Sequence, residues 1–221
     1  MMLNLFSVFD PTTSVKFSMN WLSMMLFMLY IFPKYWIQNS RISWMFNYIM
    51  TSLMKEFKSN FLKSNFKTFF FFMGLFWLVF FNNFLGLFPY IFTATSHLSV
   101  TLSLSLSFWL VFMLYGWLNK MNMMFSHLVP LGSPIYLASF MVLIETVSNL
   151  IRPITLSVRL AANMIAGHLL LTLLSNLSEM MFLIYPLTYI VILALMSLEM
   201  AVSIIQSYVF VTLMSLYFNE I

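Results

Sequence analysis

"SVRLAANMIAGHLL", residues 157–170, lies inside the apolar run 134–175 and places a permanent cation there. The guanidinium of Arg159 stays protonated at any pH that a protein meets, so it cannot become neutral when it leaves water. Near the centre of a bilayer such a charge costs about 2.5–3.5 kcal/mol on insertion scales. If the run crosses a membrane, Arg159 needs a partner or a function.

The composition of the chain indicates that the run does cross a membrane. Of 221 residues, 62% are hydrophobic and 7% are charged, whereas a soluble domain carries roughly 25% charged residues. Few Gly and Pro and no low-complexity linker indicate a single domain, 1–221. The sequence therefore predicts an all-α polytopic membrane protein. The absence of Cys excludes disulfides and thiolate metal sites.

About five membrane helices are expected. Three of them are 17–32, which is slightly short, and 68–88 and 99–118, which have the length needed to cross a hydrocarbon core of about 30 Å. The other two are 134–175 and 180–217, each nearly continuous and apolar. At 1.5 Å per residue each would reach about 60 Å, roughly twice the core thickness. We expect a long, steeply tilted hairpin; two helices broken at Pro153 and Pro186 are the alternative, but no polar loop supports that version.

Residues 34–67 differ from these spans because basic and aromatic side chains alternate there. This pattern is typical of a segment that lies in the membrane interface, and nucleic-acid binding is a poor alternative between two spans. Six of the ten basic residues fall in this segment, Lys120 falls in the loop 119–133, and the loop 90–98 has none. The positive-inside rule places 34–67 on the cytoplasm-like (matrix) side, with the N-terminus outside and the C-terminus inside.

Polar side chains recur on one side of the helix expected over 134–175. At about 100° per residue, four groups project within roughly 40° of the direction of Glu145. With Glu145 they form the polar stripe of Glu145, Asn149, Arg152, Arg159 and Asn163. His168 projects roughly opposite to Arg159. On the last helix Glu199, Ser203 and Gln206 share a face through i, i+4 and i+7 spacing.

Packing between helices explains part of this pattern. Glu145 and Arg152 are two turns apart and could pair with each other, and Asn149, Asn163 and Ser203 are as easily structural as functional. No carboxylate lies three or four residues from Arg159, so its partner must come from another helix, where Glu199 is available, or from another subunit. His168 and Glu199 can exchange protons and Arg159 cannot. The combination favours proton movement into the membrane, with Arg159 as a fixed barrier.

Three stretches resemble one family closely. "SVRLAANMIAGHLL" (157–170), "LEMAVSIIQSYVF" (198–210) and "FNNFLGLFPY" (81–90) are similar to subunit a (subunit 6) of the mitochondrial F-type ATP synthase. The opening "NLFSVFDP" (4–11) is similar to insect members, and 21 Met, 26 Phe and no Cys resemble the products of AT-rich animal mitochondrial genomes. The likeness is dense over 80–170 and 198–217 and weak over 171–197.

The resemblance implies a fold and a set of partners. The expected architecture is a tilted hairpin packed against a rotating ring of c subunits, in a multi-pass protein of the mitochondrial inner membrane. The termini would lie in the intermembrane space (N) and the matrix (C). Other partners would be membrane-sector and peripheral-stalk subunits and lipid. The chain would be a stator subunit that passes protons to and from the ring carboxylates through two half-channels, and so couples proton flow to ATP synthesis.

The resemblance also implies roles for particular residues. Arg159 matches the essential arginine, which faces the ring carboxylate and prevents protons from passing directly between the half-channels. His168 and Glu199 match the path from the intermembrane space, Asn163 and Gln206 lie near the gate, and Glu145 matches the matrix exit.

Other classes of function fit the sequence less well. No phosphate-binding Gly loop is present, so the chain should bind no nucleotide and should not be an enzyme on its own. A self-contained channel or transporter is the alternative, but no inverted repeat supports it. Three His on three segments are too few for a haem or copper carrier, so no cofactor or metal is expected. His97 and His127 lie in short loops and are expected to be interfacial.

Overall fold

The computed structural model describes residues 5–12, 18–30, 40–60, 66–88, 90–129, 135–180 and 185–220. Every regular element in these ranges is a helix. Three are 3₁₀ helices: η1 (Leu5–Phe9), η2 (Met19–Tyr30) and η3 (Ala94–Ser96). The α-helices are α1 (Arg41–Asn60), α2 (Phe66–Gly86), α3 (Leu98–Asn119), α4 (Met121–His127), α5 (Ile135–Met180) and α6 (Tyr185–Glu220).

Four of the described helices are long and apolar enough to cross a membrane, namely α2, α3, α5 and α6. They agree with the predicted all-α membrane fold. The first predicted span, 17–32, is described only over 18–30, where Met19–Tyr30 forms η2, a 12-residue 3₁₀ helix. At about 2.0 Å per residue such a helix reaches roughly 24 Å. A fifth membrane span therefore stays a prediction.

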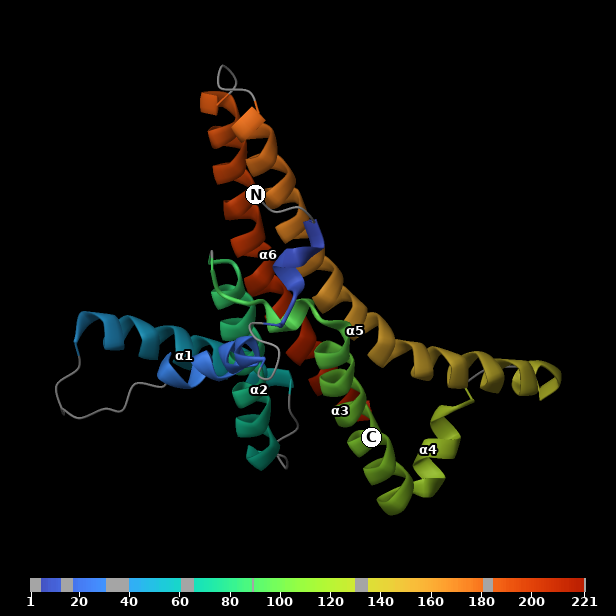
Figure 1. Ribbon diagram of the computed structural model, residues 1–221. Coiled ribbons are helices and arrows are strands. Elements are labelled where there is room, and N and C mark those ends of the chain that lie inside the picture. Colours follow the sequence, from blue (N-terminus) through green and yellow to red (C-terminus); the bar gives the residue numbers. More distant parts are fainter. Residues whose placement is uncertain are drawn as a thin grey trace.

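Helix α1 occupies the described part of the basic segment 34–67. Figure 1 shows it extending sideways from α2. On one side Phe57 is buried and lies 5.9 Å from Phe76 of α2 and 5.7 Å from Tyr208 of α6 between ring centroids. On the other side Trp44 and Tyr48 are exposed and stacked. Its crosswise direction and exposed aromatic side chains fit a helix that lies in the membrane interface.

Helices α5 and α6 form the long hairpin that the apolar runs predict (Figure 1). With 46 and 36 residues, they reach about 69 and 54 Å at 1.5 Å per residue, so both must be inclined to cross a 30 Å core. Pro153 lies inside α5 and the helix bends in this region (Figure 1). The bend has a physical cause, because Pro removes a backbone hydrogen bond and clashes with the preceding turn. Pro186 causes no such break; it is the second residue of α6, where the missing N–H is not needed.

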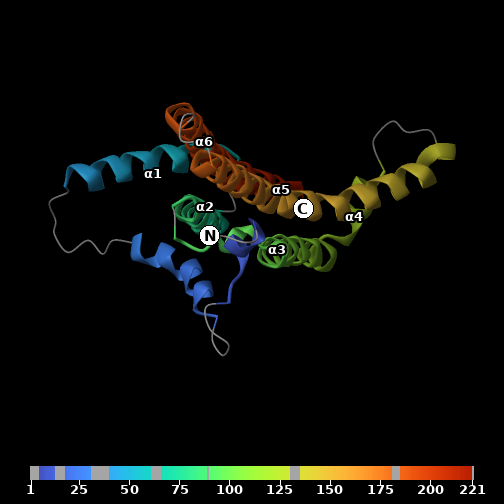
Figure 2. The same ribbon diagram turned by 45° about the horizontal axis from the view of Figure 1, so that its top comes forward.

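The helices lie in two layers. Figure 2 shows α1, α6 and α5 on one side and α2 and α3 on the other. Close contacts join α2 to α6 and α3 to α5 across the layers. The core between them is rich in aromatic side chains; for example, the Phe72, Phe112 and Phe218 rings form a mutual cluster with centroids 5.6–6.0 Å apart. In lipid this close packing of complementary side chains holds the helices together, since burial gains little against apolar tails.

Candidate functional site

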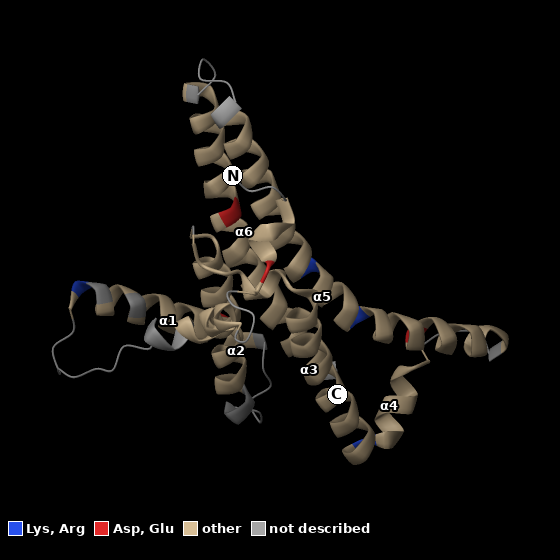
Figure 3. Ribbon diagram, in the orientation of Figure 1, with Lys and Arg blue, Asp and Glu red and all other residues tan. Residues whose placement is uncertain are grey.

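Few charged residues occur on the described helices, and Figure 3 shows several of them along α5. Those on α5 with a described side chain are Glu145, Arg152 and Arg159. On α6, Glu199 is only 9% exposed. Because a charge inside a membrane helix is costly, these four residues are the first candidates for a functional role.

A hydrogen bond joins α5 to α6 in the middle of the hairpin. The amide Nδ2 of Asn163 donates to Oε1 of Gln206. The two residues were predicted to lie close to the gate, and the structure brings them into direct contact. Amide pairs of this kind fix how two membrane helices sit against each other, because each amide would otherwise face apolar surroundings.

Glu199 lies directly against the backbone of α5 at Gly167. A Cβ atom at position 167 would come within 2.7 Å of Cδ and 2.8 Å of Oε1 of Glu199. Any larger residue at position 167 would therefore require the Glu199 carboxyl group to move from this position. Neither carboxyl oxygen has a hydrogen-bond partner among the described residues, so the group requires water or a proton.

A small cavity of about 20 Å³ connects these groups. It has room for about one water molecule. Its polar lining comes from α2, α5 and α6: Asn83, Asn163, Glu199, Ser203 and Gln206. Asn83 is 1% exposed, and its Oδ1 has no partner within the described part of the chain. A water here would satisfy several of these groups at once, which is the usual condition for buried water.

His168 follows Gly167 and turns toward α2 and η1 rather than toward the face of Arg159. Its ring hydrogen-bonds the backbone of Gly86, and the ring of Phe9 meets it edge-on with centroids 6.3 Å apart. Nε2 is buried and makes no hydrogen bond in the described ranges. The predicted separation of His168 from Arg159 is present, and His168 lies next in sequence to the glycine that receives Glu199.

Arg159 is exposed on α5, beside the exposed Val158. The structure describes an ion pair between Arg152 and Glu145 and none that involves Arg159 in the ranges it covers. Glu199, which the sequence offered as a partner, packs against Gly167 instead. Within these ranges the cation therefore has no partner of its own and faces outward.

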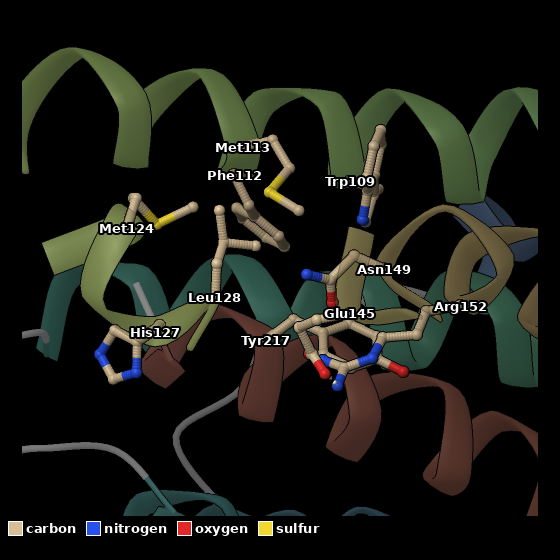
Figure 4. Close-up of a pocket in the computed structure, with 10 residues that line it drawn as sticks. All are labelled: Trp109, Phe112, Met113, Met124, His127, Leu128, Glu145, Asn149, Arg152 and Tyr217. Carbon is tan, nitrogen blue, oxygen red and sulfur yellow. Dashed lines mark ion pairs between the residues drawn. The ribbon is translucent and has the colours of Figure 1, made fainter. Parts of the chain in front are cut away.

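A second, larger pocket of about 280 Å³ lies toward the other end of α5. Figure 4 shows Glu145, Asn149 and Arg152 of α5 lining it, together with Tyr217 of α6. Arg152 Nη2 is 3.7 Å from Glu145 Oε1, and its guanidinium lies 5.2 Å from the centroid of the Tyr217 ring. The internal pair that the i, i+7 spacing allowed is thus present.

The polar stripe is divided in two near Pro153. Glu145, Asn149 and Arg152 face the larger pocket, whereas Asn163 lines the smaller cavity and Arg159 faces outward. The expected single face assumed that Pro153 leaves the helical phase intact; α5 instead bends in this region, and Leu156 between the two groups is buried.

Several residues at these sites were not predicted. Asn83 and Gly167 stand inside the quoted motifs, but neither position was given a role. The sequence did contain signals for them: Asn83 is one of two adjacent Asn in an apolar span, and Gly167 directly precedes His168. His127 was expected in a loop; it ends α4 and lines the larger pocket. His97 precedes α3, with its ring 5.3 Å from those of Trp21 and Phe92.

Comparison of the sequence with known proteins shows which family the chain belongs to. The family model described as ATP synthase A chain matches residues 2–219. The chain is 55% identical to ATP synthase subunit a of Drosophila melanogaster over 223 residues. It is 54% identical to that of Anopheles gambiae and 53% identical to that of Aedes aegypti, each over 225 residues. All three alignments cover the whole of both chains. The resemblance to arthropod subunit a is thereby confirmed, and the chain belongs to the ATP synthase A chain family.

Proposed function

We propose that this chain carries protons through two half-channels that meet the carboxylates of a rotating c-ring on either side of Arg159. Its proton-conducting role in the membrane sector of ATP synthase, beside the other subunits of that complex, follows from its family. The proposal concerns the path and the residues.

The observation that carries the proposal is the placement of an exposed Arg159 between two separate polar sites. The cavity beside it has Asn163 and Glu199 in its lining, and the pocket beyond Pro153 has Glu145. A proton that reached one site could pass to the other by way of a carboxylate on a neighbouring, moving subunit. A fixed cation at that surface attracts such a carboxylate and repels a proton.

Each residue has a separate task in this scheme. His168 and Glu199 receive protons from the intermembrane space, and the Asn163–Gln206 pair holds the cavity next to the gate. Arg159 favours the ionised form of the ring carboxylate, because an opposite charge within a few ångströms stabilises ionisation. Glu145 passes the proton to the matrix.

The same proposal includes the surroundings of the chain. We place it in the mitochondrial inner membrane with the N-terminus in the intermembrane space and the C-terminus in the matrix, since the basic segment 34–67 then lies on the matrix side. Its partners would be the c-ring, other membrane-sector and peripheral-stalk subunits, and lipid. It would bind neither nucleotide nor nucleic acid and would need no cofactor, so catalysis of ATP formation would belong to other subunits.

The test is ATP-driven acidification by inner-membrane vesicles that carry Arg159→Lys or Arg159→Gln. Native gels would establish that the complex is intact. We expect an assembled complex that no longer pumps, because Gln carries no charge, and a Lys in apolar surroundings can lose its proton and lacks the planar guanidinium. Normal pumping by both variants would make Arg159 a structural charge and overturn the proposal.

A further inference from the structure

The larger pocket contains a second group that can exchange protons, contributed by a different helix. His127, the last residue of α4, lines the pocket together with Glu145 of α5. Figure 4 shows the imidazole on one side of the pocket and the Glu145–Arg152 pair on the other. A volume of about 280 Å³ and a partly polar lining leave room for several waters between them.

Among the acidic and basic groups that line the pocket, His127 and Glu145 are the two that can exchange protons. Arg152 is the third charged group, and a guanidinium does not release its proton. It is also held in place, by Glu145 at 3.7 Å and by the Tyr217 ring. His127 is exposed, whereas the Glu145 side chain is 39% exposed and paired with Arg152. His127 is therefore open to water outside the pocket, and the described part of the chain places it in no ion pair.

We propose that His127 is a relay residue for the pocket, collecting protons from bulk water and passing them to Glu145 through pocket water. The inference rests on the proposed function, in which this pocket opens to the matrix. Imidazole is the side chain that gains and loses a proton between pH 5 and 8, which makes it suitable for exchange with a neutral solution. In each transfer Nδ1 or Nε2 takes one proton from water or buffer and gives one up to the pocket side.

The relay matters most when protons have to be captured. At pH 7 the free proton concentration is about 10⁻⁷ M, so even a collision rate constant near 10¹⁰ M⁻¹ s⁻¹ delivers only on the order of 10³ protons per second to one group. Release to water is faster from a carboxyl group, because a carboxylic acid is a stronger acid than an imidazolium and so dissociates more quickly. The effect of His127 should thus be larger in ATP-driven pumping, which takes protons from the matrix side, than in ATP synthesis, which releases them there.

The experiment uses inverted vesicles with the intact ATP synthase carrying His127→Gln or His127→Ala. Ser126→Ala is the matched control, because Ser126 lies on the same helix, is exposed and bonds only the Met123 carbonyl oxygen among the described residues. Initial rates of ATP-driven proton uptake are measured in weakly buffered medium and again with increasing imidazole.

We expect uptake by both His127 variants to be several-fold slower in weak buffer, and to return toward the control rate as imidazole rises. His127→Ala should recover further, since the smaller side chain admits the buffer. Wild-type rates in weak buffer, or slow rates that imidazole does not raise, would overturn the proposal. These outcomes are distinct from failure of the proposed function, which would appear as normal pumping by Arg159→Gln with His127 unchanged.

Discussion

The two polar sites along α5 differ in almost every physical respect. The cavity at Glu199 measures about 20 Å³, draws on three helices and has a carboxyl group packed against a glycine. The pocket at Glu145 measures about 280 Å³, draws on four helices and has a carboxyl group in an ion pair. The first site depends on the exact fit of a few atoms, and the second tolerates change because water can fill it. Substitutions that change packing should therefore have larger effects at the first site than at the second.

Among substitutions at these two sites, Glu199→Gln should have the largest effect. The amide keeps the shape of the side chain but cannot accept and release a proton, and groups acting as proton donors and acceptors contribute factors of about 10² or more. We expect ATP-driven proton uptake to fall by at least about tenfold in an assembled complex. Glu56→Gln, which alters an exposed carboxyl on α1, is the control. Equal rates for the two variants would remove Glu199 from the path.

Gly167→Ala tests the close fit itself. The added methyl would lie within 2.7 Å of the Glu199 carboxyl carbon, so this carboxyl group would have to move away from its place beside α5. Because a displacement of a reacting group by about 1 Å can cost up to about 10²-fold, proton uptake should fall by about tenfold. Gly74→Ala on α2 is the matched control, since nothing lies within 4 Å of a Cβ there. If the two alanine variants pump alike, the packing of Glu199 on Gly167 does not matter for transport.

Asn83→Leu asks whether the polar wall of the smaller cavity supports a water. Replacing the buried amide by an apolar group removes a hydrogen-bond partner worth about 0.5–1.5 kcal/mol, and uptake should fall by about fivefold. Asn82→Leu provides the comparison, because Asn82 is also buried but does not line the cavity. An equal loss in both variants would point to helix packing instead.

Arg152→Gln should have the smallest effect. The Arg152 and Glu145 side chains are 32% and 39% exposed, and exposed pairs contribute about 0–1 kcal/mol, so uptake should change by less than about twofold. Parallel measurements of proton uptake on Glu145→Gln and on the double variant would isolate the contribution of the interaction between the two side chains. A loss as complete as that of Arg159→Gln would contradict the distinction between the two arginines.

The sequence was sufficient for features that follow from periodicity and length. The apolar runs predict α2, α3 and the long hairpin, and spacing alone anticipates the Arg152–Glu145 pair. The resemblance placed both Asn163 and Gln206 near the gate, but it did not predict that they contact each other. Contacts between distant segments could not be predicted, because they depend on how the helices cross. Nothing in the sequence indicates that Glu199 packs against Gly167, or that Asn83 of α2 lines the cavity. The bend near Pro153 is a third example, since a proline in a helix predicts a kink but not which side chains it redirects.

The outward-facing Arg159 has a consequence for the life of the subunit before it joins a complex. A guanidinium at a lipid-facing surface costs about 2.5–3.5 kcal/mol until a carboxylate meets it. An unassembled chain thus carries a built-in penalty that disappears when its anionic partner docks. The residue that we propose separates the two half-channels would thus also make unassembled copies of the chain less stable in the bilayer than assembled ones.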